Sequence, residues 1–225
     1  MSRATVLIAG LTGAGLAVDR FDMDHPRLAH LMYVLDADSG TALWASEGEA
    51  PDAWTARYVT DRGAEAMEMP LPYRTDPKWS GRAQAIQLEA PELTVLGSRS
   101  DGDVTILELR LRSQRGADVL TLHADRPVQY ATVAADGHPS VVSSPSYPKE
   151  AETEEWPYEL RFYDPPSEGV RVTLRLPSEE TPRVGLSDYT VGLEEIPGFY
   201  EPPPDMDRST FHSSDLLIVG RTHDL

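Results

Sequence analysis

One short motif places side chains next to one another that could carry acid, base or nucleophilic chemistry. "HSSD" (212–215) begins with His212 and ends with Asp215. A catalytic triad is assembled from separate elements that hold nucleophile and base about 3 Å apart, so adjacency in sequence carries no weight, and no G-x-S-x-G motif occurs. We therefore interpret the motif as a turn before a strand, with Ser or Asp capping backbone groups. A hydrolase that uses His212 and nearby acids is the alternative.

Three further motifs are rich in carboxylates, which bind cations. "DMDH" (22–25) offers two carboxylates and an imidazole, but it fits a polar lead-in ahead of Pro26. "DADSG" (36–40) resembles half of a calcium loop, yet the following "TALWAS" indicates a strand before Glu47, which favours a hairpin turn. "EAETEEW" (150–156) is typical of a solvated loop, with calcium or a basic partner as the alternative. No histidine has a tight metal spacing, so we assign no catalytic, cofactor-binding or metal-binding residue.

The large aromatic side chains have two possible uses. In a β-sandwich they more often pack in the core, and the alternative is an exposed face that stacks on sugar rings. The seven considered are Trp44, Trp54, Trp79, Trp156, Tyr158, Phe162 and Tyr163. The residues that we select as a possible ligand or partner surface are Trp79, Trp156, His212 and Asp215.

The composition excludes several function classes. Acidic residues outnumber basic ones by 37 to 20 in a chain of 225, which gives a formal net charge of -17. Such a surface repels phosphate backbones, so we expect no nucleic-acid partner. The chain has no cysteine, which excludes disulfides, thiolate catalysis and cysteine-based metal sites. Only two basic residues are lysine, which favours a GC-rich genome over any particular mechanism.

The apolar stretch "TVLIAGLTGAGLAVDR" (5–20) decides the expected location. Its glycines are spaced G-x-x-G-x-G, and the few residues before Pro26 leave no room for the helix of a dinucleotide-binding fold. It fits an export signal or the end of a membrane span, while a buried first strand is the other alternative. Both export interpretations place everything after Asp19 outside the cytoplasm, membrane-associated or exported.

Alternation of polar and apolar residues dominates from residue 27 onward. In "TILELRLR" (105–112) Leu107, Leu109 and Leu111 alternate with charged residues, as in a half-buried strand. Similar runs recur about every ten residues between turns that contain Gly or Pro, while 51–59 fits either a short helix or a strand. We predict a mainly β fold: an antiparallel β-sandwich (23–225) with long Pro-rich loops, preceded by a short apolar segment (1–22).

Three stretches together resemble a known family. They are "GLAVDRFDMDHPRLAHLMYVLDADSGTALWAS…PDAWTARYV" (15–59), "YELRFYDPPSEGVRVTLRLP" (158–177) and "GLEEIPGFYEPPPDMDRSTFHSSDLLIVGRTHDL" (192–225). They resemble the C-terminal region of large membrane-bound di-zinc aminopeptidases, bacterial relatives of the vacuolar membrane protease and the endoplasmic-reticulum metallopeptidase. The closing P-G-F…P…H-S-S-D-L pattern is the most specific part. The resemblance covers most of this chain but only the last third of such a protein.

The resemblance implies a role without catalysis. In that family the zinc ions are held by a preceding peptidase domain, then membrane helices follow, and a β-rich extracytoplasmic region ends the protein. We therefore expect zinc only on that peptidase domain, no catalytic residue in this chain, and the peptidase domain or membrane helices of the same or a companion chain as partners. The alternative is an independent exported β-sandwich that binds carbohydrate or a cell-surface partner.

Overall fold

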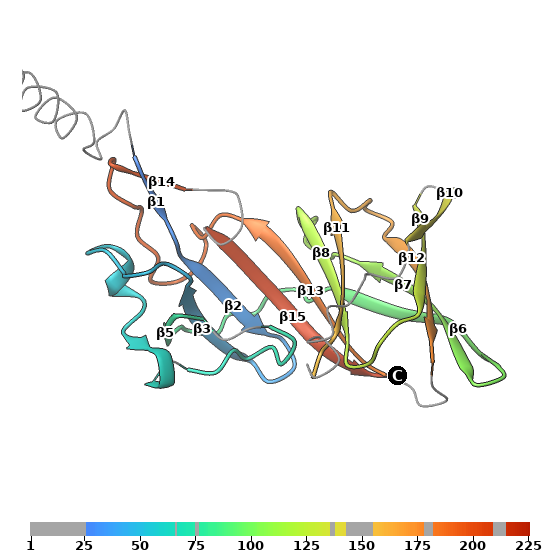
Figure 1. Ribbon diagram of the computed structural model, residues 1–225. Helices are drawn as coiled ribbons and strands as arrows, with labels where there is room; N and C mark the ends of the chain where they lie inside the picture. Colours follow the sequence, from blue (N-terminus) through green and yellow to red (C-terminus); the bar gives the residue numbers. More distant parts are fainter. Residues whose placement is uncertain are drawn as a thin grey trace, which may run out of the picture.

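A computed structural model describes residues 26–65, 67–74, 77–135, 138–142, 155–177, 182–208 and 215–225. Within these residues the chain is mainly β, arranged as three sheets (Figure 1). Two of the sheets pack face to face, which confirms the predicted fold class. The apolar segment 1–22 lies outside the described residues.

The largest sheet has the strand order β11-β8-β13-β15-β2-β3-β5-β4. Its strands are β2 (Met32–Asp36), β3 (Thr41–Ser46), β4 (Asp61–Arg62), β5 (Trp79–Arg82), β8 (Val119–Ala124), β11 (Tyr158–Tyr163), β13 (Arg183–Val191) and β15 (Leu216–Asp224). Neighbouring strands are antiparallel except β2 and β15, which are parallel. This pair departs from the all-antiparallel prediction, because no hairpin joins two strands so distant in sequence and fixes their direction.

The second sheet has five antiparallel strands in the order β10-β9-β12-β7-β6. They are β6 (Glu92–Asp101), β7 (Val104–Arg112), β9 (Tyr130–Ala135), β10 (His138–Val142) and β12 (Val170–Leu176). A third sheet pairs β1 (Arg27–Ala29) with β14 (Met206–Arg208) in parallel. Two 3-10 helices, η1 (Thr55–Arg57) and η2 (Gly63–Glu65), complete the described elements, so the stretch 51–59 contains a short helix.

The sandwich core lies between the five-stranded sheet and the β11-β8-β13 part of the large sheet (Figure 1). Leu107, Leu109 and Leu111 of β7 are buried in it, while Glu108 between the first two and Arg112 after the last are exposed. The predicted alternation of this strand is therefore confirmed. The alternation also gives the five-stranded sheet an outer face that points away from the core.

The other half of the large sheet is covered on both faces. In β2, Tyr33 and Leu35 belong to one apolar cluster, and Met32 and Val34 belong to another. Successive side chains of a strand point to opposite faces, so these clusters lie on opposite sides of the sheet. A strand covered on both faces is apolar throughout, which explains why "MYVL" shows no alternation.

Tyr73 covers the face of the large sheet that points away from the sandwich core. It packs in a slot left by two glycines, since a Cβ on Gly185 of β13 would lie 2.1 Å from Tyr73 Cδ1. A Cβ on Gly220 of β15 would lie 2.3 Å from Tyr73 Oη. The hydroxyl donates a hydrogen bond to the Leu186 carbonyl oxygen at 3.1 Å. The glycines therefore allow a buried aromatic ring to lie directly on the two strands.

We expect Gly185→Ala and Gly220→Ala each to lower the free energy of unfolding by about 1–3 kcal/mol, because the added methyl group overlaps Tyr73. Gly97→Ala in β6 is the control, since its Cβ would meet only a Glu108 carboxylate oxygen at 3.9 Å. The control should change stability by less than about 0.5 kcal/mol. Urea unfolding gives the free energy of unfolding of all three variants. An equal loss for Gly97→Ala and Gly220→Ala would contradict the tight packing of Tyr73 against the glycines.

Candidate functional site

The structure separates the two tryptophans selected from the sequence. Trp156 is 9% exposed and packs edge-on against Tyr73, with ring centroids 5.5 Å apart, and the Arg183 guanidinium lies 5.0 Å from its ring. Trp79 is half-buried against the cluster on the opposite face of the large sheet, and Arg62 lies 5.0 Å from its ring. Trp156 therefore offers a ligand little surface, and the two rings do not form one binding face.

Asp215 lies in the turn before β15. It is buried, and its φ of 56° places its backbone in the left-handed region. Its amide donates to the Leu31 carbonyl oxygen at 2.7 Å, and its own carbonyl accepts from the Gly192 amide at 2.8 Å. Asp215 thus joins the start of β2 to the end of β13 at the position where the sequence predicts a turn. His212 lies outside the described residues.

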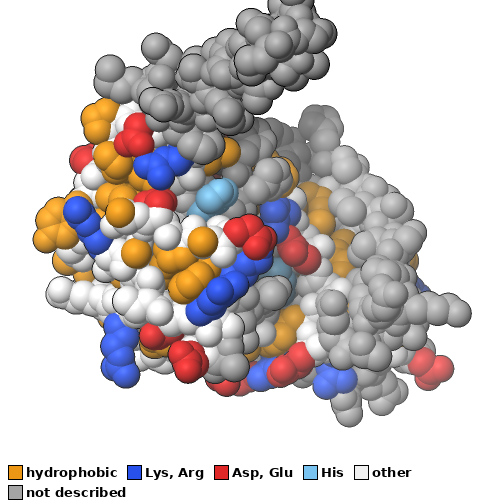
Figure 2. Space-filling view, turned by 60° about the vertical axis from the view of Figure 1, so that its left-hand side comes forward, with side chains coloured by type: hydrophobic (Ala, Val, Ile, Leu, Met, Phe, Trp, Pro, Cys, Tyr) orange, Lys and Arg blue, Asp and Glu red, His pale blue; other side chains and the backbone are white. Residues whose placement is uncertain are grey.

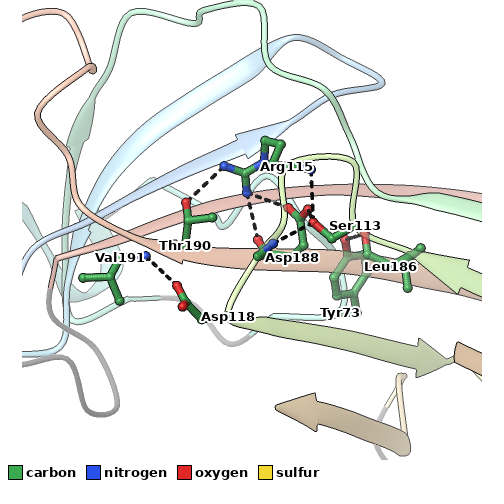
Figure 3. Close-up of polar contacts among 9 residues, drawn as sticks. Tyr73, Ser113, Arg115, Asp118, Leu186, Asp188, Thr190 and Val191 are labelled. Atoms are coloured by element: carbon green, nitrogen blue, oxygen red, sulfur yellow. Dashed lines mark hydrogen bonds and ion pairs between the residues drawn. The ribbon is translucent and has the colours of Figure 1, made fainter. Parts of the chain in front are cut away.

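A buried ion pair that the sequence did not reveal links the two sheets (Figure 3). Arg115 follows β7, and its Nη2 lies 2.6 Å from Asp188 Oδ1 on β13. Ser113 Oγ donates to the other carboxylate oxygen at 2.6 Å, and Arg115 Nη1 donates to Thr190 Oγ1 at 3.1 Å. The Asp188 side chain is fully buried and that of Arg115 is 11% exposed. Each carboxylate oxygen already has a partner, which suits a structural clamp better than a general base.

Burial raises the pKa of Asp188, while Arg115 and Ser113 act in the opposite direction. The guanidinium is thus the main source of compensation for a buried negative charge. Next to it, Asp118 accepts a hydrogen bond from the Val191 amide at 3.1 Å, and its own amide donates to the Tyr189 carbonyl oxygen. The only sign of this ion pair in the sequence is the turn-forming "SQRGAD" (113–118) between two β-rich runs, which contains Arg115 and Asp118.

A second group of buried polar residues lies under Tyr73. The His123 ring stacks on the Tyr73 ring, with centroids 4.8 Å apart and planes 26° apart. Burial is the main cause that lowers the pKa of His123 to about 3, with a smaller effect from nearby arginines. His123 Nε2 and Thr121 Oγ1 have no hydrogen-bond partner among the described residues. The neutral imidazole therefore serves as a packing group at neutral pH.

A groove of about 570 Å³ lies beside β1. Its walls include Arg27, Leu28, His30, Glu49, Pro51 and Asp52. The charged groups have partners: Arg27 pairs with Asp205 at 2.7 Å, Glu49 pairs with Lys78 at 2.7 Å, and the Asp52 carboxylate accepts from the Trp54 and Thr55 amides.

The groove suits contact with an apolar partner better than acid-base chemistry. The Leu28 side chain is 54% exposed, and Pro51 lies in the same wall. Figure 2 turns this end of the molecule forward and shows apolar side chains gathered between isolated charged ones. The charged side chains of its walls are thus paired within the chain, and the apolar side chain of Leu28 is exposed beside them.

No protein-family model, curated protein or solved structure matches this chain. Within the described ranges, no three His, Asp or Glu side chains are grouped so that they could hold a metal ion. In the same ranges no helix is long and apolar enough to cross a membrane.

Removing the Arg115 guanidinium should destabilise the folded protein. We expect Arg115→Met to lower the free energy of unfolding by about 3 kcal/mol at pH 7, because Asp188 stays buried without its cation. The loss should be smaller at pH 5, because a carboxyl with a raised pKa binds its proton first in the folded state, and folded-state proton uptake favours folding as pH falls.

The double variant Arg115→Met/Asp188→Leu should recover most of the stability that Arg115→Met loses, since no charge remains buried. Lys78→Met is the control, because the Lys78–Glu49 pair is exposed, with 51% and 92% of the side chains accessible. The control should cost less than about 1 kcal/mol. The same loss in the free energy of unfolding for Arg115→Met and Lys78→Met, measured with a denaturant, would contradict the structural role of the Arg115–Asp188 ion pair.

His123 should make the fold acid-sensitive before the carboxylates titrate. Its pKa falls from 6.5 in the unfolded chain to about 3 in the fold, so the unfolded state binds the proton first as pH drops. Stability should fall by about 2 kcal/mol from this residue between pH 7 and pH 5. His123→Phe should remove that part of the pH dependence in urea unfolding. If the free energy of unfolding of His123→Phe depended on pH as steeply as that of the wild type, the prediction would be contradicted.

Proposed function

We propose that the chain is a non-catalytic, extracytoplasmic β-rich domain that accompanies a membrane-bound zinc aminopeptidase. It packs on the peptidase domain or membrane helices of the same or a companion chain, and it controls access of substrate. Zinc belongs to the peptidase domain, and we assign no ligand of it to this chain. The proposal rests on the three stretches that resemble that family, 15–59, 158–177 and 192–225.

The packing of two of these stretches against each other carries the proposal. Strands β1 and β2 from the first stretch pair in parallel with β14 and β15 from the last. Trp54 Nε1 donates to the Tyr200 carbonyl oxygen at 2.8 Å, and the Tyr200 amide donates to Tyr58 Oη at 2.8 Å. The described parts of stretches far apart in sequence thus share one apolar cluster. Stretches that belong to one domain of that family are expected to pack together as one structural unit, as these two do.

The groove beside β1 offers a place for the partner. The Arg27 amide donates to the Asp205 carbonyl oxygen at 2.8 Å, and the side chains of these residues form an ion pair. The start of β1 is thus held firmly to the segment before β14. The exposed Leu28 lies beside this Arg27–Asp205 ion pair, in the wall of the groove. An apolar surface held rigidly after the apolar segment 1–22 suits contact with membrane helices.

The alternative, an exported carbohydrate-binding module, loses support from the burial of Trp156. It would depend on Trp79, whose ring is already covered on one side by Arg62. A glycan-array signal abolished by Trp79→Ala, with Trp54→Phe as a buried control, would favour this alternative over our proposal.

Cell fractionation tests the proposed location. An antibody raised against residues 26–225 should detect the epitope in the membrane fraction, and protease added to intact spheroplasts should remove the signal. A cytoplasmic marker must survive the same treatment as the control. An epitope found in the cytosol would overturn the proposal, as would a purified chain that cleaves aminoacyl-anilides in the presence of zinc.

A further inference from the structure

The outer face of the five-stranded sheet carries an unusual concentration of arginine. Register and alternation place these side chains together, pointing away from the sandwich core. The five residues, which we call the arginine face, are Arg99 on β6, Arg110 and Arg112 on β7, and Arg171 and Arg175 on β12. Three acidic residues share the face, Glu92, Asp101 and Glu108. Five positive against three negative charges leave the face cationic on a chain of net charge -17.

Two of these arginines stand directly opposite each other. Arg171 on β12 is the cross-strand partner of Arg110 on β7, with Thr94 of β6 on the other side of Arg110. Like charges at directly opposite positions of a sheet destabilise it. The Arg110–Arg171 pair therefore lowers the stability of the sheet, and contact with an acidic partner would offset this repulsion.

Few of the guanidinium groups on the arginine face lie close to a carboxylate of the chain. Arg175 lies 3.6 Å from Asp101, and Arg112 donates to the Ser167 carbonyl oxygen at 2.9 Å. Among the residues described, Arg99, Arg110 and Arg171 form no ion pair. Four arginines elsewhere in the structure do: Arg27, Arg115, Arg183 and Arg221 each have a carboxylate within 3.5 Å. Within the part of the chain that the structure describes, these three guanidinium groups therefore have no carboxylate partner.

We propose that the arginine face binds an acidic protein segment in extended conformation. Alternate residues of a strand are about 6.8 Å apart, so acidic residues at every second position of an extended peptide repeat at the spacing of Arg110 and Arg112. Guanidinium groups match carboxylates with two parallel hydrogen bonds. Tyr130, 41% exposed with Arg175 5.8 Å from its ring, adds an aromatic edge to the surface.

The charge of the whole chain favours a short segment over an extended polyanion. A lipid surface or a long phosphate polymer also approaches the acidic remainder of the molecule and is repelled by it. A short peptide contacts the arginine face alone, because charges more than about 10 Å away are screened at 0.1 M salt. This inference stands independently of the proposed function.

Fluorescence anisotropy with the full chain and a labelled peptide of sequence Glu-Ser-Glu-Ser-Glu-Ser-Glu tests the proposal. The peptide should bind at 50 mM salt and weaken as salt is raised, and its lysine counterpart should not bind. Arg110→Gln and Arg171→Gln should each weaken binding by about threefold. Arg57→Gln is the matched control, since Arg57 is exposed on η1, away from the sheet.

Thermal unfolding separates a binding role from a structural one. Arg171→Gln relieves repulsion with Arg110, so it should raise the unfolding midpoint while it weakens peptide binding. Absence of peptide binding, tighter binding of polyphosphate than of the peptide, or an equal loss with Arg57→Gln would each overturn the proposal. A lower unfolding midpoint for Arg171→Gln would also overturn it, because the arginine would then serve the fold.

Discussion

Strand β15 is the constraint on which the rest of the structure depends. It pairs antiparallel with β13 on one side and parallel with β2 on the other. Without it the large sheet divides into β11-β8-β13, which belongs to the sandwich, and β2-β3-β5-β4, which does not. Its side chains also complete both apolar clusters around β2, since Ile218 and Val219 point to opposite faces. The sandwich and its extension therefore form one cooperative unit.

The buried polar groups fix how the layers meet. The Arg115–Asp188 pair holds the connection after β7 against β13 and so sets the position of one sheet over the other. Well-packed apolar residues often replace such a pair without loss of stability, so its contribution is mainly one of position. Tyr73 acts similarly on the opposite face of the large sheet, where Gly185 and Gly220 make room for its ring.

The sequence predicts what is local and misses what joins distant segments. Alternation in 104–112 and 170–176 identified strands and their buried faces, because a period of two is a property of a few neighbouring residues. The parallel pairing of β2 with β15 and the contact of Arg115 with Asp188 leave no local pattern. Arginines alternate visibly in both "LELRLR" and "VRVTLRL", but only the register shows that Arg110 and Arg171 are neighbours. Trp156 and Trp79 look alike in sequence, yet they lie on opposite faces.

The parallel partnership of β2 and β15 also affects the synthesis of the protein. A ribosome that adds 5–20 residues per second completes β15 roughly 10 to 40 s after β3. During that interval the β2-β3 hairpin exposes an unpaired edge and the apolar side chains of Met32 and Val34, features that promote association with other chains. Protection of this hairpin by a chaperone would then decide the yield of folded protein.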